Sequence, residues 1–123
     1  AEVGYDDLAY DYFLQSLYFV LVDSLCNTAD GVHIANAGGV WSAIVHGFAG
    51  MADNGEQLRL APRLPAAWAS LAFRIKRHAS VLSVTLDADG ATVRVESGNP
   101  VPIRHGDIVG NVDVCASIRF ARV

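Results

Sequence analysis

The spacing of hydrophobic residues changes about half-way along this chain. Before Asp53, apolar residues recur every three or four positions, as on one face of an amphipathic helix. After the Asp53-Asn-Gly55 turn signal, apolar and polar residues alternate, as in strands with one buried face. The sequence therefore predicts a helical region, residues 1–54, and a β-rich region, residues 55–123.

Two helices are expected in the first region. Residues 5–25 contain no Gly or Pro, and Asp6 and Asp7 suit a first helical turn. A second helix is expected from about Gly39 to about Ala49. The turn residues between them predict a helical hairpin joined by a loop.

Residues 17–22 of the first helix are apolar on every face. Such a helix has to be covered on all sides. The run is too short, and too closely flanked by Asp11 and Asp23, to span a bilayer. Because this chain offers few helices to cover it, we expect either self-association through residues 17–22 or contact with parts of a longer protein.

The second region predicts a small antiparallel β-sandwich. Five or six short strands with turns between them are typical of that architecture. The alternating segments are 58–60, 71–76, 82–86, 93–95, 101–103 and a last strand over 112–120.

Composition and charge exclude several classes. Just over half of the 123 residues are hydrophobic (52%) and 18% are charged, which argues against disorder. A net charge of −4 gives no electrostatic footprint for nucleic acid or an anionic membrane. No signal peptide is visible, which predicts a cytoplasmic protein. The chain begins directly in a helical pattern, and we interpret it as a piece of a longer protein.

The two cysteines, Cys26 and Cys115, lack the paired spacing of a metal site. A disulfide between them is one alternative, but free buried thiols in a reducing compartment fit the composition better.

The segment 28–51 carries the most suggestive chemistry. His33 lies just before Gly38 and Gly39, where a helix is expected to begin. Backbone N–H groups at a helix start lack partners within the helix, and glycine lets an anion approach them closely. The segment therefore predicts an oxyanion pocket.

Three motifs give this chain a resemblance to a known family. They are Gly31-Val-His-Ile-Ala-Asn-Ala-Gly-Gly-Val-Trp41 with Gly47-Phe-Ala-Gly-Met51, the earlier Gly4-Tyr-Asp-Asp-Leu-Ala-Tyr-Asp-Tyr-Phe13, and Leu58-Arg-Leu-Ala-Pro-Arg-Leu-Pro-Ala-Ala-Trp68. Together they resemble the C-terminal end of glycoside hydrolase family 65, which includes maltose, trehalose and kojibiose phosphorylases and related hydrolases. The resemblance weakens after about Gly98, and it does not assign residues 108–123.

The resemblance implies an α+β fold: the last helical hairpin of an (α/α)6 barrel over residues 1–54, then a C-terminal β-sandwich over residues 55–123. It implies a parent enzyme in which phosphate attacks the anomeric carbon of an α-glucoside disaccharide with inversion, giving β-glucose 1-phosphate. Phosphate is then a co-substrate, and no metal or other cofactor is implied.

By match to the family motif, the phosphate-binding residues are His33, Asn36, Gly38 and Gly39. Many phosphorylases of the family have Ser at the position of Asn36, which leaves phosphorolysis and hydrolysis both open. The catalytic acid has no counterpart here, so we expect no catalytic residue on this chain and no activity from the chain alone. A non-catalytic module of residues 55–123 that binds sugar or a partner is the other alternative.

The remaining candidates have structural interpretations. We expect His46 in a core or interface, and His78 and His105 in solvent. The run Arg74-Ile-Lys-Arg77 is interpreted as the outward face of a strand, and Asp87 and Asp89 as a hairpin turn. Trp41 and Trp68 are interpreted as core or inter-domain anchors.

Overall fold

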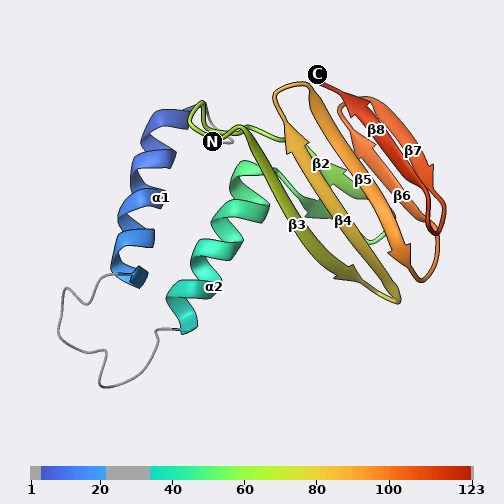
Figure 1. The fold of residues 1–123 in the computed structure, drawn as a ribbon, viewed down its shortest axis with the longest axis horizontal. Helices are drawn as coiled ribbons and strands as arrows, with labels where there is room; N and C mark the ends of the chain where they lie inside the picture. Colours follow the sequence, from blue (N-terminus) through green and yellow to red (C-terminus); the bar gives the residue numbers. More distant parts are fainter. Residues whose placement is uncertain (1–3, 22–33, 123) are drawn as a thin grey trace.

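The computed structural model describes residues 4–21 and 34–122, with side chains for residues 4–18 and 37–122. Two helices lie beside a β-sandwich, and α2 lies between α1 and the sandwich (Figure 1). The predicted change from helix to strand is therefore confirmed. Among the described residues, neither helix combines the length and apolar character that a bilayer span requires.

The two helices run in opposite directions, as expected for a hairpin (Figure 1). Helix α1 (Asp6–Leu21) has Asp6 and Asp7 in its first turn, where they complement the helix dipole. Helix α2 (Ile34–Ser42) begins earlier than the Gly39 we expected. It continues as the π-helix η2 (Ala43–Phe48), where the Ala49 amide donates to the Ile44 carbonyl at 2.9 Å.

An aromatic cluster joins the helices to the chain that follows them. The ring of Phe13 on α1 meets that of Phe48 on η2 edge-on, with centroids 5.4 Å apart. Trp68 lies against both rings, at 5.5 Å from Phe13 and 5.1 Å from Phe48. Trp68 is thus the anchor that we predicted. Trp41 is not a core anchor, because its side chain is 47% exposed.

The end of η2 requires glycine. Gly50 has φ +58°, and a Cβ at this position would collide with the backbone of Ala61. The Ala61 amide donates to the Gly50 carbonyl, and the Arg63 amide donates to that of Phe48 at 2.8 Å. This close pairing holds the link to the sandwich against the helix end.

The strands form two four-stranded sheets. One sheet has the order β1-β2-β6-β7 and the other β3-β4-β5-β8. Their bounds are β1 (Ala52–Asp53), β2 (Leu58–Leu60), β3 (Ser70–Arg77), β4 (Ser80–Asp87), β5 (Gly90–Ser97), β6 (Val101–His105), β7 (Ile108–Val112) and β8 (Ser117–Ala121). Strands β2 and β6 pair in parallel, so the purely antiparallel sandwich that we expected is wrong for this sheet. The origin of the hairpin in an (α/α)6 barrel and the division at residues 54 and 55 stay predictions.

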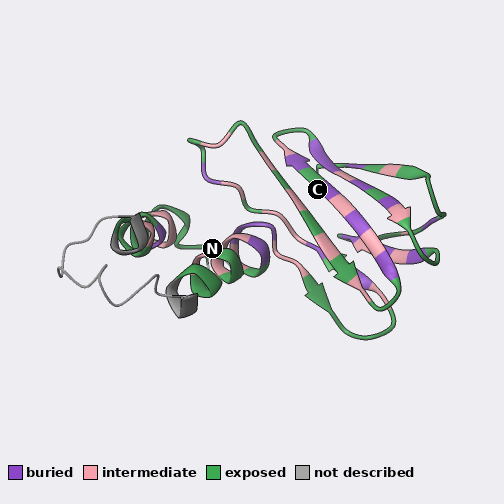
Figure 2. Ribbon diagram, turned by 60° about the horizontal axis from the view of Figure 1, so that its bottom comes forward, coloured by how far each residue is buried: buried purple, intermediate pink, exposed green. Residues whose placement is uncertain are grey.

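The core lies between the two sheets, where the buried residues gather (Figure 2). Leu58, Leu60 and Ile103 contribute from one sheet, and Leu82, Val84 and other alternating residues from the second. Strands such as β4 and β6 therefore bury alternate side chains, as the alternation predicted.

The last predicted strand is two strands. Residues 112–120 contain the last residue of β7, a connection and most of β8, and the two strands belong to different sheets. Cys115 between them has φ +63°, a left-handed conformation that breaks an extended run. Cys115 is exposed and free rather than buried, and Cys26 lies outside the described residues.

Two charged or polar side chains point inward against our expectation. His105 is 3% exposed, and its Nδ1 donates to the Leu60 carbonyl at 3.1 Å, so its assignment to solvent was wrong. Arg77 shares the inward row of β3 with Ile75, and its side chain is only 10% exposed. Arg74 and Lys76 do lie on the outward face.

Candidate phosphate site and neighbouring crevices

The predicted phosphate residues lie at the start of α2 and just before it. His33 lies outside the described residues. Asn36 belongs to the first turn of α2, and its side chain is also outside the described set. Gly38 and Gly39 are exposed positions farther along α2.

The helix start can favour an anion. The first N–H groups of a helix have no carbonyl partner within it, and they carry the positive end of the helix dipole. The first turn of α2 contains no acidic residue that would repel a phosphate. Because α2 begins at Ile34, the unpaired amides lie near residues 34–36. The amides of Gly38 and Gly39, by contrast, face carbonyls of the preceding helical turn and are not free.

Nothing in the described part of the chain requires glycine at positions 38 and 39. Neither residue has a positive φ, and a Cβ on either would meet no atom within 4 Å. Each glycine nevertheless destabilises a helix interior by about 1 kcal/mol relative to alanine. These two positions therefore leave room for something outside the described residues to approach α2 closely.

A groove of about 350 Å³ runs between the two helices. Its walls include Phe13 and Ser16 of α1, and Gly39, Val40 and Gly47 of the second helical segment. The groove is largely apolar and reaches the helix turn that contains Gly39.

A second crevice of about 360 Å³ lies where α2, β1 and β3 come together. Its lining combines Trp41 from α2 and Asp53 with Arg74, Lys76 and His78 from β3 and its following turn. Sequence reasoning missed this crevice. The signals in the sequence were Trp41 in the second helix and the basic run 74–77 at the end of a strand. We interpreted the two separately.

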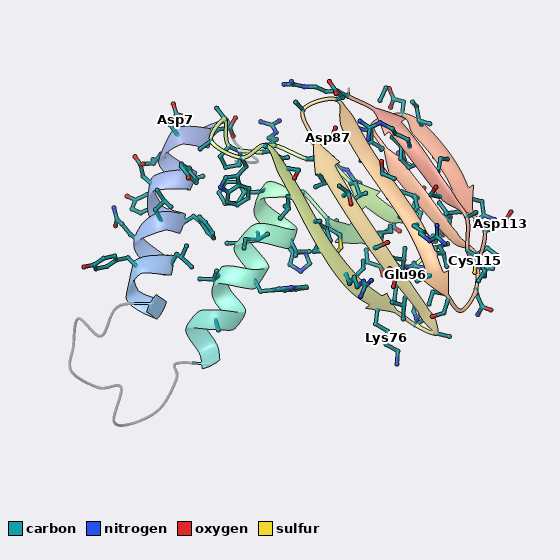
Figure 3. All side chains as sticks on the ribbon, viewed as in Figure 1. Asp7, Lys76, Asp87, Glu96, Asp113 and Cys115 are labelled. Atoms are coloured by element: carbon teal, nitrogen blue, oxygen red, sulfur yellow. The ribbon has the colours of Figure 1, made fainter. Side chains whose placement is uncertain are left out.

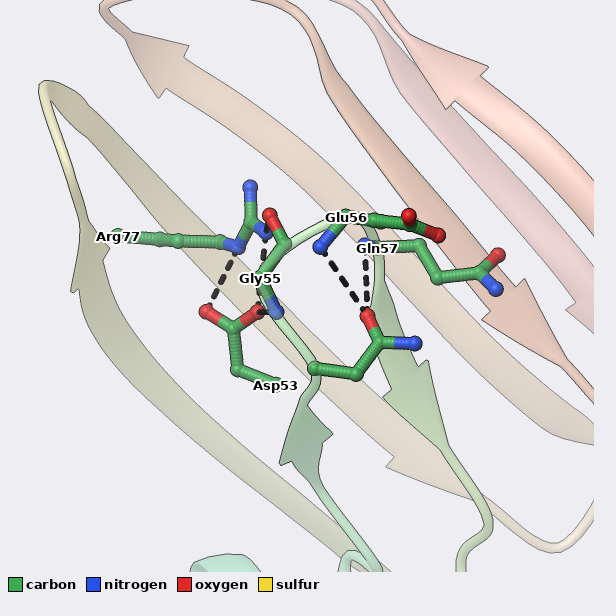
Figure 4. A network of polar contacts seen from close by, with 6 residues as sticks. Asp53, Gly55, Glu56, Gln57 and Arg77 are labelled. Atoms are coloured by element: carbon green, nitrogen blue, oxygen red, sulfur yellow. Dashed lines mark hydrogen bonds and ion pairs between the residues drawn. The ribbon is translucent and has the colours of Figure 1, made fainter.

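Two residues of this lining, Asp53 and Arg77, form an ion pair (Figure 4). The Arg77 guanidinium donates from Nε to Asp53 Oδ2 at 2.8 Å and from Nη2 to Asp53 Oδ1 at 2.9 Å. Nη2 also donates to the Gly55 carbonyl at 2.9 Å. The hydrogen bonds from Arg77 hold the pKa of Asp53 below its ordinary value of 3.8, with smaller contributions from the Gly55 amide and the nearby His78.

The two histidines nearest the crevice are both exposed. His46 donates from Nδ1 to the Met51 carbonyl at 2.9 Å, and its ring meets the edge of Trp41. Its exposure shows that a core position was wrong, and the alternative that we gave, an interface, stays a prediction. His78 is exposed as expected, and it has φ +51°, which is uncommon for a residue other than glycine.

The acidic residues of the β4–β5 turn are structural, as expected. Asp87 accepts hydrogen bonds from the Asp89 and Gly90 amides and from the Arg119 guanidinium. Arg119 lowers the pKa of Asp87, and the carboxylate in turn raises the pKa of Arg119. A carboxylate held ionised in a turn is poorly suited to act as a general acid.

Comparison with known proteins assigns the family. Residues 51–109 match the family model described as "Glycosyl hydrolase family 65, C-terminal domain". An α,α-trehalose phosphorylase of Geobacillus stearothermophilus is 39% identical over 104 residues, or 85% of the chain. The chain belongs to glycoside hydrolase family 65.

Other family 65 relatives bear the names of disaccharide phosphorylases. An α,α-trehalose phosphorylase of Thermoanaerobacter brockii is 36% identical over 86% of this chain. A kojibiose phosphorylase of the same organism is 34% identical over 79% of it. The chain spans only about 14% of the length of these trehalose phosphorylases, so it corresponds to a small part of them.

A solved structure supports the fold over almost the whole chain. A putative kojibiose phosphorylase from the human microbiome superposes with a TM-score of 0.84 over 98% of this chain and 16% of its own. At 24% identity this likeness concerns the fold. The helices and the sandwich together therefore match the fold of one part of that structure.

Proposed function

We propose that this chain is the C-terminal part of an inverting phosphorylase of α-glucosidic disaccharides of the trehalose or maltose type. An oxygen of inorganic phosphate attacks the anomeric carbon, and the bond from that carbon to the glycosidic oxygen breaks. A carboxylic acid elsewhere in the parent protein gives its proton to the departing oxygen. The products are β-glucose 1-phosphate and the acceptor sugar.

The similarity to trehalose phosphorylases is the observation that carries this proposal. A match over 85% of the chain is too long to leave out the segment from His33 to Gly39. The family-model match, over residues 51–109, does not reach that segment. The longer match thus joins the loop, the helix and the sandwich in one relative.

The proposed role of this chain is to supply one wall of the phosphate site. His33 and Asn36 donate hydrogen bonds to the phosphate, together with the free amides of the first turn of α2. Gly38 and Gly39 keep that side of α2 free of side chains. This role needs no metal or organic cofactor, and phosphate enters as co-substrate.

The test is an assay of the full-length parent protein with trehalose, maltose and kojibiose, with and without phosphate. We expect glucose 1-phosphate from at least one sugar and none without phosphate. Release of free glucose at the same rate in both conditions would assign hydrolysis instead. The 123-residue chain alone should form no product, because the acid and the sugar subsites belong to other parts of the parent protein.

We also propose that α1 is a contact surface. Leu8, Tyr12 and Tyr18 are exposed on it, at 50%, 61% and 59%. Large apolar side chains gathered on one helix indicate an interaction site. In the isolated chain we expect them to drive self-association, and Leu8→Lys with Tyr12→Lys should restore a monomer in sedimentation velocity. A wild-type chain that stays monomeric at high concentration would overturn this expectation.

A further inference from the structure

The crevice beside β3 has the composition of a binding site that the proposed reaction does not use. Strand β3 is the outer strand of its sheet and has no strand partner on the side of β1 and α2 among the described residues. The resulting space of about 360 Å³ is within the usual range for small-molecule sites. Figure 3 shows Lys76 near the end of β3 that leads into β4.

One wall of this crevice is an indole ring. Trp41 is 47% exposed, whereas Trp68, the other tryptophan, packs in the aromatic cluster between the helices. The indole ring of a half-exposed tryptophan presents a flat apolar face with a polar N–H at its edge. The C–H face of a pyranose ring is complementary to such a surface.

Basic residues also line this crevice, in a chain whose net charge is −4. Arg77 is occupied by Asp53, and Arg74 lies 3.2 Å from Glu96. Lys76 makes no hydrogen bond or ion pair with another described residue, and His78 lies close enough to Asp53 to lower the pKa of its carboxyl. Lys76 and His78 are thus the donors available to an incoming anion.

The backbone at His78 supports a role for its side chain. A left-handed conformation costs a residue other than glycine about 1 kcal/mol, and His78 has φ +51° in the turn after β3. Glycine would adopt this geometry without that cost. Strain retained at the mouth of a crevice is a reason to look for a function there.

We propose that this crevice binds a sugar phosphate, with the pyranose ring on Trp41 and the phosphate between Lys76 and His78. The Asp53 carboxylate is bound to Arg77 but its side chain is 38% exposed, so it can accept further hydrogen bonds from sugar hydroxyls. This site is separate from the phosphate position proposed near His33. It depends on residues of this chain alone, whether or not the parent protein is a phosphorylase.

The test is a titration of the 123-residue chain with glucose 1-phosphate, followed by tryptophan fluorescence. The chain carries His33→Ala, so that the loop before α2 does not contribute to binding. We expect a saturable change in emission, and tighter binding of glucose 1-phosphate than of glucose or inorganic phosphate alone. Trp41→Phe should remove the spectral change, and Lys76→Gln should weaken binding on the order of tenfold.

His78→Gly separates binding from folding. This variant should bind about tenfold more weakly and yet unfold at a temperature no lower than the parent chain, because glycine relieves the backbone strain. Arg122→Gln is the matched control, since Arg122 follows β8 at the opposite edge of the same sheet.

Three results would overturn the proposal. One is the absence of saturable binding. Another is binding of inorganic phosphate as tight as that of glucose 1-phosphate. The third is unchanged affinity in both Lys76→Gln and His78→Gly. Each of these can occur while the full-length protein shows phosphorolysis, so the two proposals fail independently.

Discussion

The sandwich and the helical pair place their apolar side chains differently. In the sandwich, alternate residues of both sheets, such as Leu82 and Ile103, are completely buried. On α1, large apolar residues such as Leu8 and Tyr12 are half or more exposed, and Phe13 alone is buried among the described side chains. The sandwich thus has a core of its own, whereas α1 presents an apolar surface without a cover from the described chain.

This difference indicates which region of the chain depends on contacts with other parts of a protein. A region with its own core can fold with few outside contacts, and an uncovered helix needs a partner. The proposed phosphate residues lie next to the region that needs a partner. We infer that this site is completed by contacts that the sandwich does not provide.

The largest expected effect on stability is the difference between a leucine-to-alanine substitution in the sandwich and the same substitution on α1. Leu82→Ala should lower the free energy of unfolding of the isolated chain by about 3 kcal/mol, because it leaves a cavity between the sheets. Leu8→Ala should change it by about 0.5 kcal/mol or less, since that side chain is half exposed. Urea unfolding of both variants measures the difference. Similar losses in both would mean that α1 shares the core of the sandwich.

The next effect concerns the ion pair that holds the turn after β1 against β3. Arg77→Gln should lower stability by about 1.5 kcal/mol, because it removes hydrogen bonds of a mostly buried guanidinium to the Asp53 carboxylate. Arg74→Gln is the matched control. Its pair with Glu96 is largely exposed and should contribute less than about 1 kcal/mol.

Acid titration checks the same pair. The pKa of Asp53 is lower in the folded state than its ordinary value of 3.8, so the unfolded chain binds more protons in that range. The stability that the ionised Asp53 contributes is complete above the pKa of Asp53 in the unfolded chain. It is lost as the pH falls through the lower pKa of the folded chain. Asp53→Asn should therefore flatten the loss of stability below about pH 4. An unchanged acid profile in this variant would show that Asp53 is not held by Arg77 in solution.

A smaller effect is expected for glycine substitutions in the helical region. Gly38→Ala should stabilise α2 in the isolated chain by about 1 kcal/mol, since its Cβ meets no atom. In the full-length protein it should reduce phosphorolysis, if this side of α2 has to remain bare. Gly50→Ala is the control and should destabilise the chain, because Gly50 has a positive φ beside Ala61. Amide exchange of α2 measures the first effect, and loss of stability in Gly38→Ala would contradict it.

The strand pattern carried most of the information about the sandwich, including two residues that we misassigned. His105 falls in the same alternating row as Val101 and Ile103, and Arg77 in that of Phe73 and Ile75. The alternation within each strand points both residues inward, whereas we interpreted the whole run 74–77 as an outward face and expected His105 in solvent beside basic neighbours. A local partner, the Leu60 carbonyl or the Asp53 carboxylate, makes the inward position possible. Such partners are distant in sequence and cannot be read from the pattern.

Other features depended on contacts or conformations that the sequence does not display. The parallel pairing of β2 with β6 joins residues more than forty positions apart, such as Leu58 and Ile103. The break at Cys115 follows from a left-handed conformation that carries no glycine signal. Gly38 and Gly39 suggested a helix start, although α2 already begins at Ile34. The resemblance, by contrast, was carried by the motifs themselves, and the family assignment agrees with it.

The most direct test of the account is the kinetics of His33→Ala in the full-length protein. If this chain supplies a wall of the phosphate site, the KM for phosphate should rise at least tenfold, which is the loss of one charge-assisted hydrogen bond of about 1.5 kcal/mol. The KM for the disaccharide should stay within about twofold. An unchanged KM for phosphate, with full phosphorolysis, would contradict the account.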